Sequence, residues 1–259
     1  MYLAVKPQAD CLSAWREAVR AVDAQPGHAA YNVIVDVADP TARASLVDPA
    51  VAAMSAFLAN KGKKPIETVA NTIFPASLER RYGAPAFFDV FHDRVLPKVR
   101  LKKRWSGYYF ERMMALPTHD GRTVNQVWDI VQRLRDPKVG ALNKFELAVF
   151  DPARDVDGSP RGGHCMSFAS LKLTGPRGNR RLSMTVMYRN HFYIEKLLGN
   201  LIGLGRLLEF IAREGKVAMG SLTIVSTHAE IDMGNWNRDE LKAMLAECDQ
   251  ASAQLADAA

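Results

Sequence analysis

The chain has 259 residues, of which 48% are hydrophobic and 24% are charged, and its formal net charge is +6. This length and apolar content are enough for a full hydrophobic core, and we expect a single domain over residues 1–259. The sequence has no uninterrupted apolar run of roughly 18 residues and no signal-peptide pattern at its N-terminus. We therefore expect a cytoplasmic protein that does not enter the membrane.

Three cysteines, Cys11, Cys165 and Cys248, are widely separated along the chain. Their odd number argues against a disulfide framework, and their spacing matches no zinc site, so no metal is predicted. A reducing compartment agrees with this pattern.

The first half of the chain alternates helical and extended patterns. Apolar residues at helical spacing predict an amphipathic helix over 10–22, which QPG ends, and the alternating β-branched run 31–37 predicts a strand. Helical patterns return over 48–58 and 66–73. Proline-rich breaks at 64–65, 75, 85 and 97 divide the region that follows.

A basic cluster then precedes an aromatic stretch. Its members are Lys98, Arg100, Lys102, Lys103 and Arg104. A solvated surface is the favoured interpretation, and a phosphate-bearing ligand is the alternative. Because only WSGYYF at 105–110 offers interleaved aromatic residues, nucleic acid is not expected as a partner.

The second half predicts most of a sheet and its helices. A capped helix is expected over 123–136, strands over 145–150, 166–173 and 182–188, a turn over 174–181 and a further strand over 217–231. A long, largely apolar helix over 190–215 must be buried on most of its surface, and an amphipathic helix over 238–255 closes the chain. The order predicts a mixed α+β fold.

Polar side chains occur at the ends of these predicted strands. Cys165 opens one strand, Arg189 ends the next, Asn200 lies on the long helix, and His228 ends the last strand. A lone cysteine is most often a small core residue, which is the structural alternative to a reactive thiol. Because successive residues of a strand point to opposite faces, we expect His164 not to act as the base of Cys165.

In this order, residues 163–232 resemble the thymidylate synthase family, in which a cysteine nucleophile, a phosphate-binding arginine, an asparagine and a histidine follow one another. The stretch DGRTVNQVWDIVQRLRDP at 120–137 is similar to the family's DGR helix, and Glu67 stands where the family has its catalytic glutamate. The resemblance covers roughly the last two thirds of the chain, and residues 1–60 diverge from it.

The resemblance implies a thymidylate synthase-like fold with one long buried central helix, and a transferase of the pyrimidine nucleotide class. Cys165 would add as a thiolate to C6 of the base, and C5 would receive a methyl or hydroxymethyl group from methylenetetrahydrofolate. Glu67 would move protons, and Arg189 would favour the thiolate. Asn200 would bind the base and His228 the sugar. A homodimer is implied, in which each subunit lends residues to its neighbour's phosphate site.

Several positions differ from the family pattern. The differing residues are His164 in place of proline, Asn190 in place of serine, Phe192 in place of the aspartate that helps to orient folate, Glu230 in place of tyrosine, and Asn143 and Lys144 in place of an arginine pair. These replacements predict a non-standard nucleotide, with Glu230 contacting a ribose or a modified sugar. The resemblance implies uracil as its base, because the cytosine-specific members carry an aspartate at the position of Asn200. They also predict that folate binds weakly, in another pose, or not at all.

A second function class therefore stays open, namely a catalytically inactive relative that binds a ligand or serves in an assembly. In that interpretation Arg189 forms a surface ion pair, Glu67 is a helix N-terminal carboxylate, and Asn200 is satisfied by a neighbour. His228 is then a structural hydrogen-bonding residue.

Overall fold

The computed structural model describes residues 2–99, 107–141, 143–156, 163–176 and 178–257. Its main sheet has the strand order β1-β2-β9-β7-β6-β5, with β8 paired to β9. These strands are β1 (Leu3–Ala4), β2 (Ala29–Val37), β5 (Phe145–Ala148), β6 (Met166–Thr174), β7 (Arg181–Tyr188), β8 (His191–Phe192) and β9 (Ala218–Glu230). Because β9 runs parallel to β7 and antiparallel to β2, the sheet is mixed, and the α+β class is confirmed.

Helices and a small second sheet complete the fold. The second sheet pairs β3 (Leu116–Pro117) with β4 (Thr123–Val124). The α-helices are α1 (Cys11–Asp23), α2 (Pro49–Asn60), α3 (Ile66–Asn71), α4 (Ala76–Tyr82), α5 (Ala86–Val90), α6 (Leu96–Val99), α7 (Tyr109–Met114), α8 (Gln126–Arg135), α9 (Pro152–Asp155), α10 (Leu197–Gly215) and α11 (Arg238–Asp257). A 3₁₀ turn covers Pro26–His28, and a π-helical turn covers Phe91–Val95.

Side-chain caps explain where several helices begin. The Asp10 carboxylate accepts a hydrogen bond from the Ser13 amide at 2.8 Å, and the Asn125 side chain accepts one from the Trp128 amide at 3.0 Å. Such caps satisfy backbone donors that have no partner inside the helix. The expected helix over 123–136 therefore begins at Gln126, after its cap, and Thr123 lies in β4 instead.

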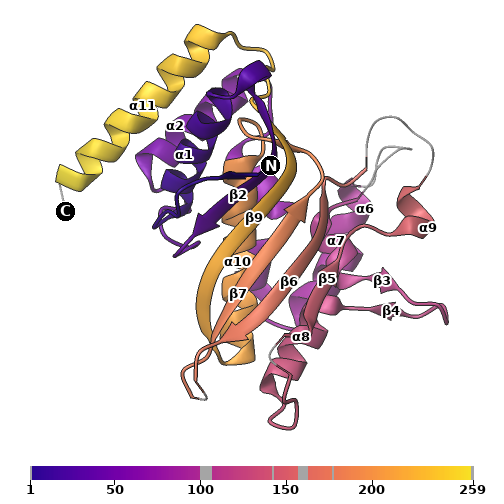
Figure 1. Ribbon diagram of the computed structural model, residues 1–259. Helices are drawn as coiled ribbons and strands as arrows, with labels where there is room; N and C mark the ends of the chain where they lie inside the picture. The colour runs from indigo at the N-terminus through magenta and orange to yellow at the C-terminus, as the bar shows by residue number, and fades with distance from the viewer. Residues whose placement is uncertain (1, 100–106, 142, 157–162, 177, 258–259) are drawn as a thin grey trace.

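The helix α10 forms the centre of the packing against one face of the sheet (Figure 1). Its sequence is rich in glycine because other segments approach its backbone closely. A Cβ at Gly199 would lie 2.6 Å from the Val69 Cβ, and a Cβ at Gly203 would lie 2.7 Å from the Ala70 carbonyl oxygen. Both neighbours belong to α3, so these two glycines hold α3 directly on α10.

The opposite face of β6, β7 and β9 carries no helix of the described residues in Figure 1. Alternation along β7 agrees, since Val186 and Tyr188 are buried whereas Met187 is exposed. Met187 pairs in register with Phe168 of β6, which is also exposed. These strands therefore present apolar side chains on an uncovered face.

The predicted long helix is shorter than expected at its N-terminal end. His191 and Phe192 form β8, which pairs with Ala229 and Glu230 of β9, and α10 starts only at Leu197. The apolar pattern of this stretch suits a buried strand as well as a buried helix, which is why periodicity alone placed the boundary wrongly. The remaining predicted strands are confirmed within a few residues of their expected ends.

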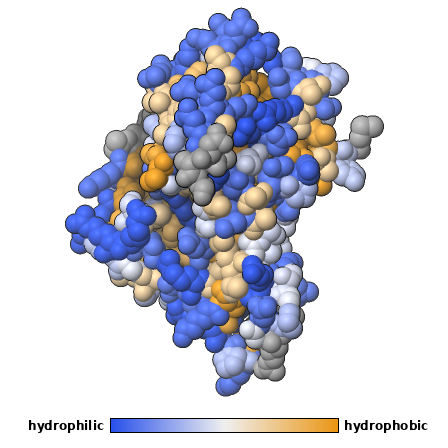
Figure 2. Space-filling view, turned by 90° about the vertical axis from the view of Figure 1, so that its left-hand side faces the viewer, coloured by the Kyte–Doolittle hydropathy of each residue, from blue (hydrophilic) through white to orange (hydrophobic). Residues whose placement is uncertain are grey.

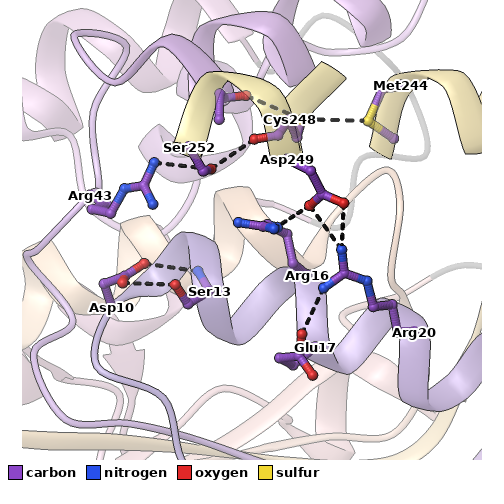
Figure 3. Close-up of polar contacts among 11 residues, drawn as sticks. Asp10, Ser13, Arg16, Glu17, Arg20, Arg43, Met244, Cys248, Asp249 and Ser252 are labelled. Atoms are coloured by element: carbon purple, nitrogen blue, oxygen red, sulfur yellow. Dashed lines mark hydrogen bonds and ion pairs between the residues drawn. The ribbon is translucent and has the colours of Figure 1, made fainter. Parts of the chain in front are cut away.

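The closing helix α11 lies against α1 and α2 (Figures 1 and 3). Asp249 of α11 forms ion pairs with both Arg16 and Arg20 of α1. The Cys248 thiol lies beside them and donates to the Ala50 carbonyl at 3.5 Å. We call this set of contacts the α1–α11 contact.

Figure 2 shows one side of the molecule, on which hydrophilic side chains dominate and hydrophobic residues form separate small patches. Across the described ranges, no helix has both the length and the apolar character needed to cross a membrane.

Candidate active site

A cavity of about 330 Å³ lies where the chain enters β6 and leaves β7. We call it the Cys165 pocket. It is lined by Lys64, Val69, Thr72, residues 107–109, residues 163–165, residues 190–192, Lys196 and Asn200. The volume is at the small end of the range for ligand sites, so the pocket suits one small molecule.

Backbone contacts fix the segment that carries Cys165. The Arg189 amide donates to the Cys165 carbonyl at 2.8 Å, and the Arg189 Nε donates to the His164 carbonyl at 3.0 Å. Gly163, just before them, has a φ of +75°, a conformation that favours glycine. The end of β7 thus holds the thiol at the pocket wall.

His164 also lines the pocket, next to Cys165. The strand alternation behind the expectation for His164 does not apply, because β6 begins only at Met166, so the statement that His164 is not the base of Cys165 stays a prediction. The His164 ring lies 5.1 Å from the ring of Tyr109, another lining residue.

The thiol of Cys165 is half-buried, whereas Cys11 and Cys248 are fully buried. Burial raises the pKa of Cys165, and the positive charges of Arg189 and Lys196 act in the opposite direction. The pKa of Cys248 is raised further, to about 12, mainly by burial. Among the three, Cys165 alone combines access from a cavity with nearby cations.

The side chain of Asn200 is held by a buried polar chain. Its Nδ2 lies 2.9 Å from the Nε2 of His191, whose Nδ1 lies 3.1 Å from the Ser226 hydroxyl. Burial lowers the pKa of His191 to about 3, so the ring is neutral at physiological pH. The Asn200 nitrogen faces Nε2, and a neutral ring accepts there in the tautomer that carries its proton on Nδ1, toward Ser226.

Glu67 lies on α3 but does not line the Cys165 pocket. Its two carboxylate oxygens accept hydrogen bonds from Arg206 of α10 at 2.9 and 2.8 Å. The hydrogen bonds from Arg206 lower the pKa of Glu67. Val69 and Thr72 of the same segment do line the pocket, so Glu67 points away from the side of α3 that does.

The other predicted residues lie at different distances from the pocket. Asn190 and Phe192 line it, and His228 is one contact away, since its Nδ1 lies 2.5 Å from the Asn190 Oδ1. Glu230 is not a lining residue, and its carbonyl accepts from the Tyr193 amide at 3.0 Å. Lys144 is exposed just before β5 and does not line the pocket.

The lining includes several residues that were not candidates from the sequence, among them Lys64, Tyr109, His191 and Lys196. Burial raises the pKa of the Tyr109 hydroxyl, which keeps it protonated. Lys196 directly precedes α10. It was not singled out because the expected helix began at residue 190 and therefore included it. Lys64 precedes α3 in one of the proline breaks, a pattern without a functional signal.

Most of the basic cluster, namely Arg100, Lys102, Lys103 and Arg104, lies outside the described residues. Lys98, which the structure describes, is exposed and does not line the Cys165 pocket. Within the described ranges, no group of three or more His, Cys, Asp or Glu side chains is placed to hold a metal ion.

No model of a known protein family matches the chain, and no curated protein is detectably similar to it in sequence.

Proposed function

We propose that the protein transfers a one-carbon unit to C5 of a pyrimidine nucleotide, with Cys165 as the nucleophile. The observation that carries the proposal is the Cys165 pocket itself, in which a half-buried thiol, an oriented amide at Asn200 and the cation of Lys196 line one small cavity. A nucleotide offers an electrophilic ring carbon, a hydrogen-bonding edge and an anion, which are the three features that these groups recognise.

The chemistry needs one covalent bond to the protein. The Cys165 thiolate adds to C6 of the base, and the C5–C6 double bond becomes an enolate. C5 then forms a bond to the electrophilic carbon of a one-carbon donor, while the bond from that carbon to its carrier breaks and leaves its electron pair on the carrier. Loss of the C5 proton and breakage of the C6–S bond restore the thiolate and the double bond. The positive charges near Cys165 favour the thiolate that starts this sequence.

The orientation of Asn200 supports uracil as the base. With its nitrogen toward His191, the amide of this lining residue leaves its oxygen, an acceptor, for a ligand in the pocket. The N3–H of uracil is a donor that this oxygen accepts, whereas unprotonated cytosine has no N–H at N3. The proposed substrate is therefore a uridine nucleotide, with the sugar left as ribose or a modified form.

Methylenetetrahydrofolate as the donor is supported less well by the lining residues. Its pteridine ring carries N–H groups that pair well with a carboxylate, and the described residues that line the Cys165 pocket include no Asp or Glu. Phe192 lines the pocket where the resemblance has an aspartate. The described lining residues therefore do not fit folate in the pose that the family uses.

Exchange of the C5 hydrogen tests the proposal without a donor. Because addition of the thiolate at C6 makes C5 basic, a bound uridine nucleotide exchanges its C5–H for deuterium in D₂O, which NMR detects. Cys165→Ser abolishes the exchange, and Cys248→Ser, a change at a buried thiol outside the pocket, preserves it. Absence of exchange with every uridine nucleotide in a panel would contradict the proposal.

An inactive ligand-binding protein is the second candidate. The raised pKa of Cys165 favours this candidate, because it reduces the fraction of reactive thiolate. The pairing of Glu67 with Arg206 outside the pocket also favours it, because the expected proton-transfer carboxylate is then missing from the described lining. Nucleotide binding by calorimetry, combined with no C5 exchange, would favour this candidate.

We further propose a thymidylate synthase-like fold that forms a homodimer through the uncovered face of the sheet, and a cytoplasmic location. The exposed pair Phe168 and Met187 on that face supports an interface, and the three free cysteines agree with a reducing compartment. Light scattering that gives a monomer at micromolar concentration would contradict the dimer.

A further inference from the structure

The charges around the Cys165 pocket are unbalanced. Its described lining includes two lysines, Lys64 and Lys196, and no aspartate or glutamate. A surface cation is normally offset by solvent or a nearby carboxylate, and two cations at one small cavity attract an anionic ligand.

Lys196 shares its carboxylate partner with another lysine. Its Nζ lies 3.6 Å from the Glu195 carboxylate, which forms a shorter ion pair with Lys63. Burial lowers the pKa of Lys196, and the charge of Lys64 lowers it as well, whereas the carboxylates of Glu195 and Asp232 act in the opposite direction. An anion beside both ammonium groups would offset these effects.

Lys64 is exposed, and the described residues give it no ion pair. It lies two residues before α3, and Lys196 directly precedes the 19-residue helix α10. The positive end of the α10 dipole adds to the charge of Lys196. Asp232 offsets part of this charge, since its carboxylate accepts from the amides of Ile194 and Glu195 at 2.8 and 3.1 Å.

The residues expected to hold a phosphate lie elsewhere. The Nε of Arg189 donates to the His164 carbonyl, and Lys144 is exposed outside the pocket. Neither residue lines the cavity. The cations that do line it come from the N-terminal sides of α3 and α10.

We propose that Lys64 and Lys196 form an anion-binding pair that holds the phosphate of the pocket's ligand. The inference rests on the proposed function for the identity of the ligand as a nucleotide, and on the pocket alone for its negative charge. Binding by the pair places the phosphate beside the N-terminal sides of α3 and α10.

Two alkylating agents measure the potential at Cys165 directly. Iodoacetate and iodoacetamide react with the same thiolate, each forming an S–C bond and releasing iodide, and they differ in one negative charge. The ratio of their rates at Cys165, read by peptide mass spectrometry, is expected to exceed the ratio at free cysteine. Lys64→Gln and Lys196→Gln are each expected to lower it about fivefold, and Lys196→Arg is expected to retain it.

Lys61→Gln is the matched control, because Lys61 has the same charge three residues before Lys64 but pairs with Glu240 outside the pocket. It is expected to leave the ratio unchanged. A wild-type ratio equal to that of free cysteine, or a ratio that neither pocket variant alters, would overturn the proposal. Circular dichroism confirms that each variant is folded.

Protection experiments identify the anion. Uridine monophosphate is expected to slow alkylation of Cys165 more strongly than uridine does, and inorganic phosphate more strongly than glutarate. Stronger protection by glutarate than by phosphate would assign the pair to a carboxylate and overturn the phosphate proposal. Failure of C5 exchange, with the lysine effects intact, would reject the proposed function and leave the anion site standing.

Discussion

The α1–α11 contact and the Cys165 pocket both place a cysteine next to cations, but they differ in charge balance. In the contact, Asp249 pairs with both Arg16 and Arg20, and Cys248 is fully buried beside them. In the pocket, Cys165 is half-buried, Lys196 shares the Glu195 carboxylate with Lys63, and Lys64 has no ion pair among the described residues. Cations paired with a carboxylate, as in the contact, hold two helices together. A lysine at a cavity without a carboxylate of its own is available to bind an anionic ligand.

The largest expected difference concerns thiol reactivity. Iodoacetamide is expected to label Cys165 about 10³-fold faster than Cys11 or Cys248, because the buried thiols react only after the structure opens. Peptide mapping over a time course measures the three rates. Labelling of Cys165 only after denaturation would place it in the core and remove the contrast between the two regions.

A smaller effect is expected from Asp232, the carboxylate beside the turn that leads into α10. Burial raises its pKa from 3.8 to about 6. The folded state therefore binds more protons than the unfolded state between pH 4 and 6, so wild-type stability falls as pH rises through this window and is level above it. Relative to Asp232→Asn, the wild type is expected to gain on the order of 2 kcal/mol between pH 7.5 and 4.5.

Urea denaturation of both proteins at several pH values measures this difference. A difference that stays constant with pH would show that Asp232 is not destabilised by its burial. The result would also weaken the contrast with Asp249, which is paired with arginines.

The α1–α11 contact should respond to loss of its carboxylate. Asp249→Asn is expected to lower the free energy of unfolding by about 1 kcal/mol, because two partly exposed ion pairs are lost. The effect should shrink in 1 M salt. Glu17→Gln is a suitable control, since Glu17 contacts only the exposed side of Arg20. A change in Cys165 alkylation with Asp249→Asn would contradict the separation of the two regions.

No effect of pH is expected on the ionisation of His191 near neutrality. Because the pKa of His191 is about 3, its ring is expected to show no titration by NMR between pH 5 and 8. The orientation of Asn200 should then be independent of pH over this range. A titration midpoint near pH 6.5 would show that the buried chain from Ser226 to Asn200 does not hold His191 neutral.

The sequence predicted the strands and the buried character of α10 because their apolar periodicities are strong. It also placed Cys165, Asn190 and Asn200 where the structure brings them to one cavity. It did not predict Lys64 or Lys196, since a lysine before a helix has no distinguishing local pattern. It also missed the direction of Glu67, because a six-residue helix such as α3 has pocket-facing and outward positions that only tertiary packing on α10 decides.

The close contact of Gly199 and Gly203 with α3 has a consequence for how related sequences can vary. Val69 of α3 touches the position of a Cβ at Gly199, and Val69 also lines the pocket. A side chain larger than hydrogen at either glycine displaces α3 and so moves the part of the pocket wall that Val69 forms. Cys165 and Asn200 do not belong to α3. Inherited changes at these two positions would therefore alter the size of the accepted molecule before they alter the chemistry performed on it.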